Sequence, residues 1–290
     1  MGLTYRDVIA RLEEAGLGED APFEAARLLE RFCGVGPETL PLAKRTVFDS
    51  PALERAVEAR CRRVPLGYVL GQVDFYRETY EVTPDTLIPR PDTEELVEAA
   101  IRRLPQGGRI LDLCTGSGCV AVSILANRRD ARGEAWEWNP GALAVAERNA
   151  ARNGVADRLT FRLADVLEAC SYERVEPCDL LVSNPPYLDA SEMASLTPEV
   201  AREPAMALDG GADGLTFYRA IAAYGRGVLK PGGAMLFEIG WKQGDALRRL
   251  SRDMGYACSV LPDIEERDRV AVLVPVAAGD CTRPETEDGA

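Results

Sequence analysis

Residues 108–127 read GRILDLCTGSGCVAVSILAN, in which a glycine-rich turn joins a short apolar segment to a longer one. The segment 108–114 has the length and composition of a buried strand, and 117–127 those of a helix. Gly116 and Gly118 lie in the turn, where the lack of a Cβ atom lets the backbone pass close to a ligand. A strand, a glycine-rich turn and a helix in this order predict one unit of a parallel sheet.

The same alternation of strand and helix continues toward the C-terminus. Further strands are expected at 133–139, 158–163, 178–184 and 234–240, and helices at 140–154, 215–229 and 243–255. The segments 257–263 and 268–276 are expected to close the sheet as an antiparallel pair. This pattern predicts an α/β fold with a doubly wound, Rossmann-like sheet over residues 93–277.

The residues before this region have a different character. Residues 1–71 show apolar positions at helical spacing, interrupted by glycines, and predict a small helical bundle. Residues 72–92 alternate and are rich in β-formers, which predicts a β-hairpin linker. The polar tail 278–290 is expected to be disordered.

Composition restricts the class of protein. The formal net charge is −13 with a pI near 4.7, which disfavours nucleic acid as the main partner because nucleic-acid binding needs a basic face. There is no histidine, and the eight cysteines form no C-x-x-C pair, so we expect no metal site. No apolar run approaches the ~20 residues that span a bilayer. We therefore expect a soluble, cytoplasmic protein without a signal peptide or membrane association.

The glycine-rich turn departs from the dinucleotide-binding pattern. Ala121 stands where G-x-G-x-x-G requires its last glycine, so a pyrophosphate ligand is disfavoured. Glu137 lies 21 residues after Gly116, where an acid accepts hydrogen bonds from ribose hydroxyls. Asp112 lies near the carboxyl end of the preceding strand, and Asp165 follows the third strand, where it could accept from an adenine amine. Acids at two strand ends suit a ligand with an amino group and a ribose but no phosphate, such as S-adenosylmethionine.

The fourth strand ends in Asn184-Pro185-Pro186-Tyr187. A residue before proline is held extended and prolines donate no N–H, so this segment is a rigid group of acceptors. The Asn184 side-chain oxygen and the Pro185 carbonyl could hold both hydrogens of an –NH2 group, with Tyr187 stacked on the planar group. Such orientation alone can lower a barrier by roughly 7–11 kcal/mol in favourable cases. The alternative is a strand end followed by a proline turn without chemistry.

With these motifs in view, the sequence resembles the release-factor glutamine methyltransferases (the HemK/PrmC family) over residues 1–275. The segments that carry the resemblance are LIPRPDTEELVE (87–98), ILDLCTGSGCVAV (110–122), LLVSNPPYL (180–188), EPAMALDGGADGLTFYRAI (203–221) and LKPGGAMLFEIGWKQGDAL (229–247). The resemblance implies a methyltransferase that acts on the side-chain amide of the glutamine in the Gly-Gly-Gln motif of peptide chain release factors. It also implies that the N-terminal helical domain helps to bind the release factor. We expect the protein to act as a monomer.

The resemblance implies a role for each matching residue. The methionine part of S-adenosylmethionine would lie along Cys114, Thr115, Gly116, Ser117 and Gly118, with its ribose on Glu137 and its adenine beside Asp165 and Val166. Asn184, Pro185, Pro186 and Tyr187 would hold the glutamine, with Asn184 and Pro185 as catalytic residues and Asn184 also touching the cofactor. Residues 90–94 would lie beside this pocket and help to shape it.

This sequence departs from the family pattern at three of these positions. Glu137 stands where aspartate is usual, which lengthens the reach of the acceptor. Cys114 replaces a common glycine, and Val166 stands where some members carry an aromatic that stacks on adenine, which would weaken cofactor binding. None of the three belongs to the substrate segment 184–187.

Two other functions fit parts of the sequence. An amino-methyltransferase that acts on a nucleic-acid base or on another protein would also use Asn184-Pro185-Pro186-Tyr187, since a flipped adenine presents a similar –NH2 group. An inactive S-adenosylmethionine-binding assembly protein would keep the glycine-rich turn but would not need the intact segment 184–187.

Overall fold

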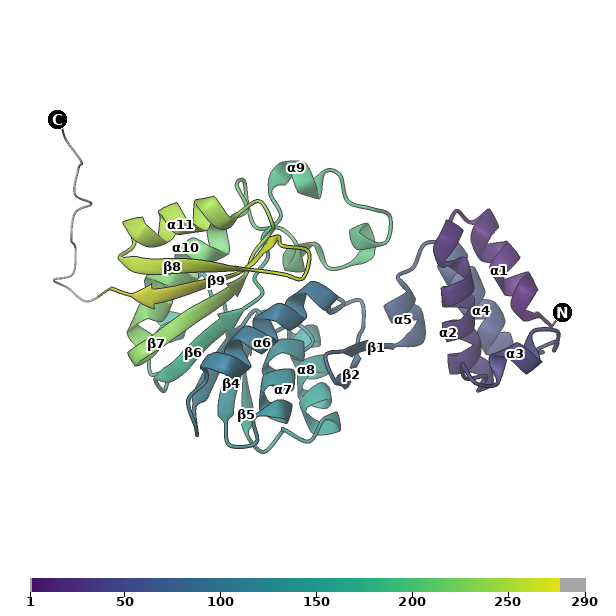
Figure 1. Cartoon of the computed structure of the whole chain (residues 1–290), viewed down its shortest axis with the longest axis horizontal. Helices are drawn as coiled ribbons and strands as arrows, with labels where there is room; N and C mark the ends of the chain where they lie inside the picture. The colour runs from purple at the N-terminus through teal and green to yellow at the C-terminus, as the bar shows by residue number, and fades with distance from the viewer. Residues whose placement is uncertain (1, 277–290) are drawn as a thin grey trace.

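The computed structural model describes residues 2–276, so the tail predicted to be disordered, residues 278–290, lies outside the described residues. The chain forms a small group of N-terminal helices and a larger α/β part, which stand side by side along the long axis of the molecule (Figure 1). Within the described residues, none of the helices has the length and apolar character needed to cross a bilayer.

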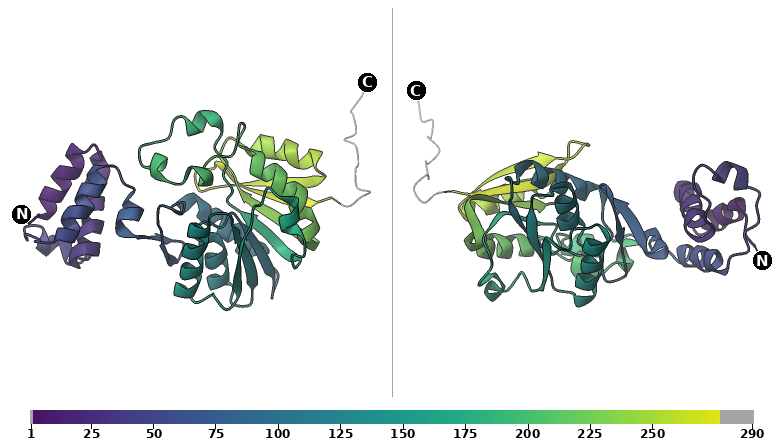
Figure 2. Two further views of the ribbon diagram at one scale, coloured as in Figure 1. Left: turned by 180° about the vertical axis from the view of Figure 1, so that it is seen from behind. Right: turned by 90° about the horizontal axis from the view of Figure 1, so that it is seen from below.

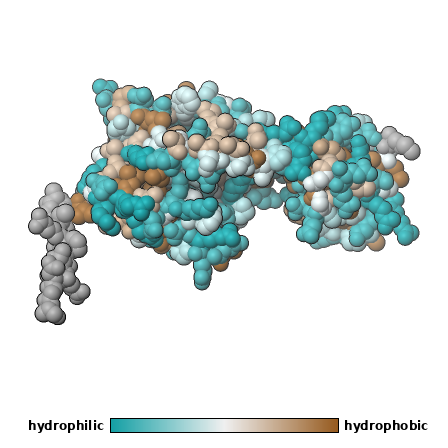
Figure 3. Space-filling view, turned by 90° about the horizontal axis from the view of Figure 1, so that it is seen from above, coloured by the Kyte–Doolittle hydropathy of each residue, from teal (hydrophilic) through white to brown (hydrophobic). Residues whose placement is uncertain are grey.

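The N-terminal part has its own apolar core. Its helices are α1 (Tyr5–Glu14), α2 (Ala21–Cys33), α3 (Leu40–Ala43), α4 (Pro51–Cys61) and α5 (Leu66–Leu70), with a short 3-10 turn η1 (Gly18–Asp20). Thr4 caps α1 in a reciprocal capping box with Asp7, and Ser50 caps α4 just before Pro51. Leu12, Leu28 and other side chains of this part are fully buried against one another. On the face seen in Figure 3, the surface of these helices is mostly polar, with only small apolar areas.

A hairpin and a loop connect the two parts. Strands β1 (Gln72–Phe75) and β2 (Glu78–Glu81) pair antiparallel, and the loop after them leads to the 3-10 turn η2 (Pro91–Thr93) and helix α6 (Glu94–Arg103). The Tyr76 backbone N–H donates to Glu94 Oε1 at 2.9 Å, which ties the hairpin turn to the first residue of α6.

The large sheet has seven strands in the order β5-β4-β3-β6-β7-β9-β8. The strands are β3 (Arg109–Leu113), β4 (Arg132–Glu137), β5 (Leu159–Leu163), β6 (Cys178–Ser183), β7 (Leu229–Glu238), β8 (Tyr256–Pro262) and β9 (Asp268–Pro275). Strands β3 to β7 are parallel, and β9 runs antiparallel to both β7 and β8. The predicted α/β fold with a doubly wound sheet and a terminal antiparallel pair is therefore confirmed; β7 begins earlier than residue 234, at Leu229.

Helices cover both faces of this sheet (Figures 1 and 2). Helices α6, α7 (Cys119–Asn127) and α8 (Pro140–Arg152) bury their apolar side chains on one face, and α10 (Thr216–Gly225) and α11 (Gly244–Asp253) on the other. Neighbouring strand residues alternate between the two cores: Leu180 and Val182 face α6 and α7, while Leu181 faces α10. The strand order reverses between β3 and β6, and the crevice at the carboxyl ends of strands at such a point is where ligands bind in open sheets.

The segment between β6 and α10 contains only short elements, namely α9 (Ala190–Met193), η4 (Val200–Arg202) and η5 (Ala205–Ala207). It is anchored to the N-terminal part through Glu199, whose carboxylate pairs with Arg63 at 2.7 Å, and through Arg202, which donates to the Arg62 carbonyl at 2.6 Å. It is anchored to the loop before η2 through Glu203, which accepts from the Ile88 backbone N–H at 3.0 Å. The remaining short turns are η3 (Ala169–Tyr172) and η6 (Arg226–Val228).

Candidate active site

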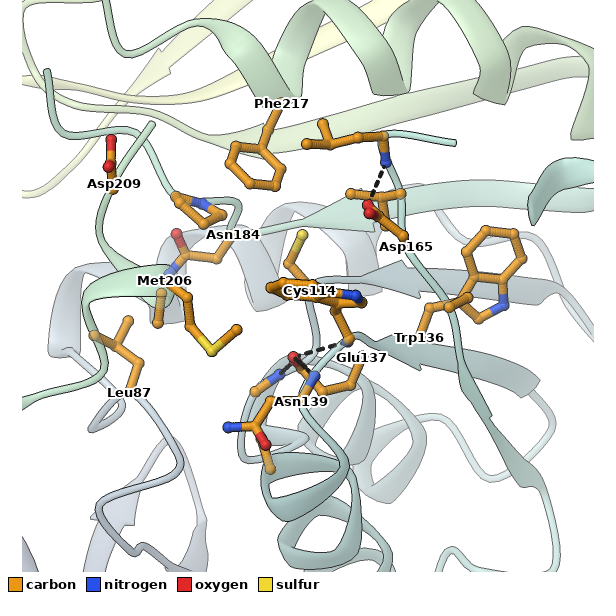
Figure 4. A pocket seen from close by; sticks show the side chains of 18 of the residues that line it. Leu87, Cys114, Trp136, Glu137, Asn139, Asp165, Asn184, Met206, Asp209 and Phe217 are labelled. Atoms are coloured by element: carbon orange, nitrogen blue, oxygen red, sulfur yellow. Dashed lines mark hydrogen bonds between the residues drawn. The ribbon is translucent and has the colours of Figure 1, made fainter. Parts of the chain in front are cut away.

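A cavity of about 280 Å³ lies at the carboxyl ends of β3, β4, β5 and β6 (Figure 4). Seven of the residues predicted from the sequence line it: Cys114, Gly116, Glu137, Asp165, Val166, Asn184 and Pro186. The structure thus brings the glycine-rich turn, the acid after β4, the loop after β5 and the segment after β6 to one space. The other predicted residues, Thr115, Ser117, Gly118, Pro185 and Tyr187, lie in the same segments but do not line the cavity.

The turn after β3 has a strained backbone that explains its composition. Cys114, Gly116 and Gly118 all have positive φ, at 59°, 57° and 82°. This left-handed conformation costs a residue with a Cβ roughly 1–2 kcal/mol, so the glycine usual at position 114 is the easier choice. A Cβ on Gly116 would meet no protein atom within 4 Å, because this residue faces the cavity. Burial raises the pKa of the Cys114 thiol well above its usual value, so it stays a neutral thiol.

Residues of the turn that do not line the cavity hold it in shape. The Thr115 backbone N–H donates to the Trp136 carbonyl at 3.0 Å, and the Ser117 carbonyl accepts from Asn149 Nδ2 at 2.9 Å. Gly118 packs against Ala146 of α8, whose Cβ would lie 3.1 Å from a Cβ at position 118. These contacts fix the turn to the adjacent strand and helix.

Glu137 contributes to the architecture of the turn as well as to the cavity. Its Oε2 accepts from the Gly116 backbone N–H at 2.8 Å, and its Oε1 accepts from the backbone N–H groups of Trp138 and Asn139 at 2.9 and 3.0 Å (Figure 4). A carboxylate has about four acceptor positions, so three backbone bonds leave little capacity for a ligand. The longer side chain of glutamate reaches back to the turn and links the ends of β3 and β4.

Asp112 is buried directly behind the turn. Thr115 Oγ1 donates to its Oδ2 at 2.5 Å, while its Oδ1 has no hydrogen-bond partner among the described residues. Burial raises the pKa of Asp112 to about 7, an effect that the hydrogen bond from Thr115 opposes. Asp112 does not line the cavity itself; its bond with Thr115 supports the turn from behind.

The part of the cavity near β5 is largely apolar. Asp165 Oδ1 already accepts from the Leu167 backbone N–H at 2.8 Å, and Val166 is buried in the cavity wall. Trp138, the residue after Glu137, lines the same space and is exposed over 60% of its surface. An aromatic ring therefore stands at the cavity although position 166 has none.

The segment 184–187 forms the opposite end of the cavity. Asn184 is half-buried, and its Nδ2 donates to Thr93 Oγ1 at 3.2 Å, which leaves Oδ1 free to accept. Pro185 and Pro186 are buried. The Tyr187 carbonyl accepts from Gln243 Nε2 at 3.0 Å, and its ring packs against the core beneath α10. The segment is therefore held at both ends, by Thr93 at Asn184 and by Gln243 at Tyr187. This agrees with the rigidity that its prolines predict.

Sequence reasoning missed several residues that line the cavity, among them Leu87, Trp138, Met206, Asp209 and Phe217. Met206 is 41% exposed, although it is a large apolar side chain. Met206 and Asp209 belong to the segment 203–221, which the family resemblance had already singled out without assigning roles. Apolar side chains around a few polar acceptors are typical of a ligand-binding pocket.

Comparisons with known proteins agree with this geometry. Residues 93–213 match the family model described as the methyltransferase small domain. A release factor glutamine methyltransferase of Cereibacter sphaeroides is 46% identical over 278 residues, which cover 94% of this chain and 98% of the relative. One from Rhodospirillum rubrum is 40% identical over 93% of this chain and 83% of its own. A methyltransferase structure from Pyrococcus furiosus superimposes with a TM-score of 0.51 at 17% identity, over 67% of this chain and 87% of its own, which shows the shared fold.

Proposed function

The chain belongs to the release factor glutamine methyltransferases, and from this premise we propose that it methylates the glutamine side-chain amide of peptide chain release factors within the cavity described above. The methyl donor is S-adenosylmethionine, and the protein is a methyltransferase. The accepting glutamine is the one in the Gly-Gly-Gln motif. The observation that carries the proposal is that a single cavity joins the glycine-rich turn after β3 to Asn184 after β6.

The residues at the cofactor end fit S-adenosylmethionine by their chemistry. Gly116 leaves space for the methionine part of the cofactor. Glu137 has one acceptor position left for the ribose, and Asp165 and Val166 border the apolar part that suits an adenine. When bound, the cofactor supplies a methyl group on a positively charged sulfur.

At the substrate end, we assign Asn184 and Pro185 to orientation of the glutamine amide. Thr93 holds the Nδ2 side of Asn184, so that Oδ1 accepts one amide hydrogen while the Pro185 carbonyl accepts the other. Both hydrogens are then directed away from the cofactor, and the nitrogen is presented to it. Tyr187 and the buried Pro186 keep the two acceptors rigid. Because the methyl group is already activated, orientation is the main task of these residues.

We assign residues 1–71 to release-factor binding, residues 72–92 to a linker and residues 93–277 to catalysis. The separate core of the N-terminal helices and their mostly polar surface support a docking part that carries no chemistry. The net charge of −13 supports a protein substrate without direct nucleic-acid contact. All groups assigned to the site come from one chain, so the proposed reaction does not require a second copy; we further propose that the protein acts as a monomer in the cytoplasm.

The direct test is methylation of purified release factors. The protein is incubated with S-adenosylmethionine and a full-length release factor, and the Gly-Gly-Gln peptide is then analysed by mass spectrometry. We expect the glutamine to gain the mass of one methylene group. Labelled cofactor offered with DNA and RNA in parallel is expected to leave both unlabelled; label in nucleic acid alone would refute the proposal.

Replacement of Gly116 by alanine is expected to weaken S-adenosylmethionine binding. The new methyl group would project into the cavity, and we expect Kd to rise by about tenfold or more, as overpacking of a tight site costs 1–3 kcal/mol. Isothermal titration calorimetry measures this Kd without substrate. Gly154→Ala is the matched control, because Gly154 has a similar φ of 69° and open space around it but lies away from the cavity. Equal Kd values for the two variants would contradict the assignment.

A further inference from the structure

The segment between β6 and α10 contacts three parts of the molecule in sequence order. It extends from the sheet toward the N-terminal helices (Figures 1 and 2). Glu199 and Arg202 contact the N-terminal part, and Glu203 contacts the loop before η2. Met206 follows directly and lines the cavity. A short stretch of chain therefore joins the proposed docking part to the wall of the active site.

Glu199 is the centre of an ion-pair cluster at the N-terminal part. Arg63 Nε lies 2.7 Å from Glu199 Oε1, and Arg63 Nη2 donates to Oε2 at 2.9 Å. Arg60 is buried, lies 3.6 Å from the same Oε1, and donates to both carboxylate oxygens of Glu24 at 2.7 Å. Burial acts to raise the pKa of Glu199, but the hydrogen bond from Arg63 and the charges of both arginines outweigh it and lower this pKa. Glu199 is therefore ionised at neutral pH.

Arg63 occupies a backbone position that favours glycine. It follows the C-cap of α4 and has φ of 63°. The Arg63 and Val64 N–H groups close the helix end by donating to the carbonyls of Arg60 and Ala59, at 2.7 and 3.1 Å. A left-handed residue in this motif is usually glycine, because a Cβ atom is disfavoured there. What arginine adds at this position is its side chain, which contacts Glu199.

We propose that Glu199 and Arg63 are positioning residues that hold the N-terminal part in a fixed orientation to the cavity, so that a release factor bound to this part presents its glutamine at Asn184. The chain passes between the two parts at Gly71, which has φ of 72°, and the Glu199 cluster is an attachment at a second place. A substrate bound at two sites gains from the first contact only when the spacing of the sites matches its own. This inference rests on the proposed roles of Asn184 and of residues 1–71.

The cavity end of the segment has attachments of its own. Glu203 accepts from the Ile88 backbone N–H at 3.0 Å, and its side chain is 1% exposed. Farther along, the Leu188 backbone N–H donates to the Leu208 carbonyl at 3.0 Å. Loss of the Glu199 cluster should therefore free the N-terminal part while the cavity wall stays in place.

Glu199→Ala and Arg63→Gly test the contact from its two sides. For each variant, kcat/KM is measured with a full-length release factor and with a short peptide that contains the Gly-Gly-Gln motif but does not reach the N-terminal part. With the full-length factor we expect kcat/KM to fall by about tenfold or more, because the advantage of two-site binding is lost. With the peptide we expect it to stay within about threefold of the wild-type value, as does the Kd of S-adenosylmethionine.

The choice of glycine at position 63 separates this role from a contribution to stability. Glycine suits the left-handed backbone, so we expect the Tm of Arg63→Gly to stay close to that of the wild-type protein while activity on the full-length factor falls. The double variant is expected to lose no more activity than either single variant, since both residues act through one pair. Glu81→Ala is the control, because Glu81 also pairs with an arginine at 2.7 Å, Arg148, but outside the N-terminal part.

The outcomes separate this inference from the proposed function. Equal losses with the full-length factor and the peptide, or full activity of both variants on the full-length factor, would overturn the inference and leave the function intact. If the wild-type protein turns over the peptide too slowly to measure, the Kd of S-adenosylmethionine decides: an unchanged Kd with reduced activity on the full-length factor supports the inference, and a raised Kd overturns it. A wild-type protein that methylates no release factor would refute the function, and this inference with it.

Discussion

An Asn184→Ala variant is expected to bind S-adenosylmethionine with a Kd within a few fold of the wild-type value and to methylate release factors with kcat reduced by about 10²–10³-fold. The alanine removes the side-chain acceptor for one hydrogen of the glutamine amide. An unpaired buried donor costs about 1–3 kcal/mol, and a misplaced reacting group can cost a further factor of about 10² in rate.

The contacts of Asn184 in the structure explain why no neighbour can replace it. Its side chain is held by Thr93, and the prolines that follow offer no N–H and keep their backbone fixed. Water could enter the space that the side chain leaves, but no covalent bond would fix its position relative to the substrate amide. The substrate amide could then rotate, and its nitrogen would face the cofactor only part of the time.

Single-turnover kinetics with a saturating release factor measures this effect on the chemical step, and calorimetry measures cofactor binding separately. Asn153→Ala is the control, since the Asn153 side chain also donates hydrogen bonds, in its case to the backbone carbonyls of Thr79 and Asn149, but lies at the end of α8 away from the cavity. A kcat for Asn184→Ala within a few fold of that for Asn153→Ala would show that Asn184 does not orient the substrate.

Local patterns predicted the strands and the order of the site segments well. The apolar runs at 108–114 and 178–184 became the adjacent parallel strands β3 and β6, so the turn and Asn184 meet at one edge. This follows from the rule that carboxyl ends of parallel strands lie together and requires no knowledge of side-chain contacts. The fold class was therefore predictable from periodicity and turn residues.

Long-range contacts were not predictable in the same way. Thr93 reaches Asn184 across 91 positions in the sequence, so no local pattern indicated that these two side chains would meet. Glu137 was predicted as a ribose acceptor, but no local pattern indicated that three backbone N–H groups would occupy most of its acceptor positions. Met206 enters the cavity from the segment between β6 and α10, whose path depends on ion pairs of Glu199 and Glu203, while Phe217 enters it from the first turn of α10.

The segment after η5 supports the substrate end of the site through two close backbone contacts. A Cβ on Gly210 would lie 2.7 Å from the Tyr187 Cα, and a Cβ on Gly214 would lie 2.4 Å from the Tyr187 carbonyl oxygen. Gln243 Nε2 donates to the carbonyls of both Tyr187 and Gly214, at 3.0 and 3.2 Å. The glycines in ALDGGADGL thus allow this loop to lie directly against the segment 184–187, with Gln243 joining the two.

Gly214→Ala is therefore expected to reduce both activity and stability. Gly214 has φ of 69°, which costs an alanine roughly 1–2 kcal/mol, and the clash with the Tyr187 carbonyl adds about 1–3 kcal/mol of overpacking. The structure can relieve the clash only by moving the Tyr187 backbone or the Gln243 amide. Either movement displaces the acceptors at Asn184 and Pro185, and we expect kcat to fall by about 10²-fold, as for a displacement near 1 Å.

Two control variants separate the causes of this loss. Gly154→Ala introduces the same backbone strain without a clash, and Gly227→Ala introduces a methyl group without strain or close neighbours. Both are expected to keep kcat near the wild-type value, although Gly154→Ala should lower Tm slightly. Activity is measured well below the Tm of each variant, so that unfolding does not contribute. A Gly214→Ala variant that lost stability but kept kcat would contradict this prediction. The loop would then support folding alone, and orientation of the substrate amide would not depend on the position of the Tyr187 backbone.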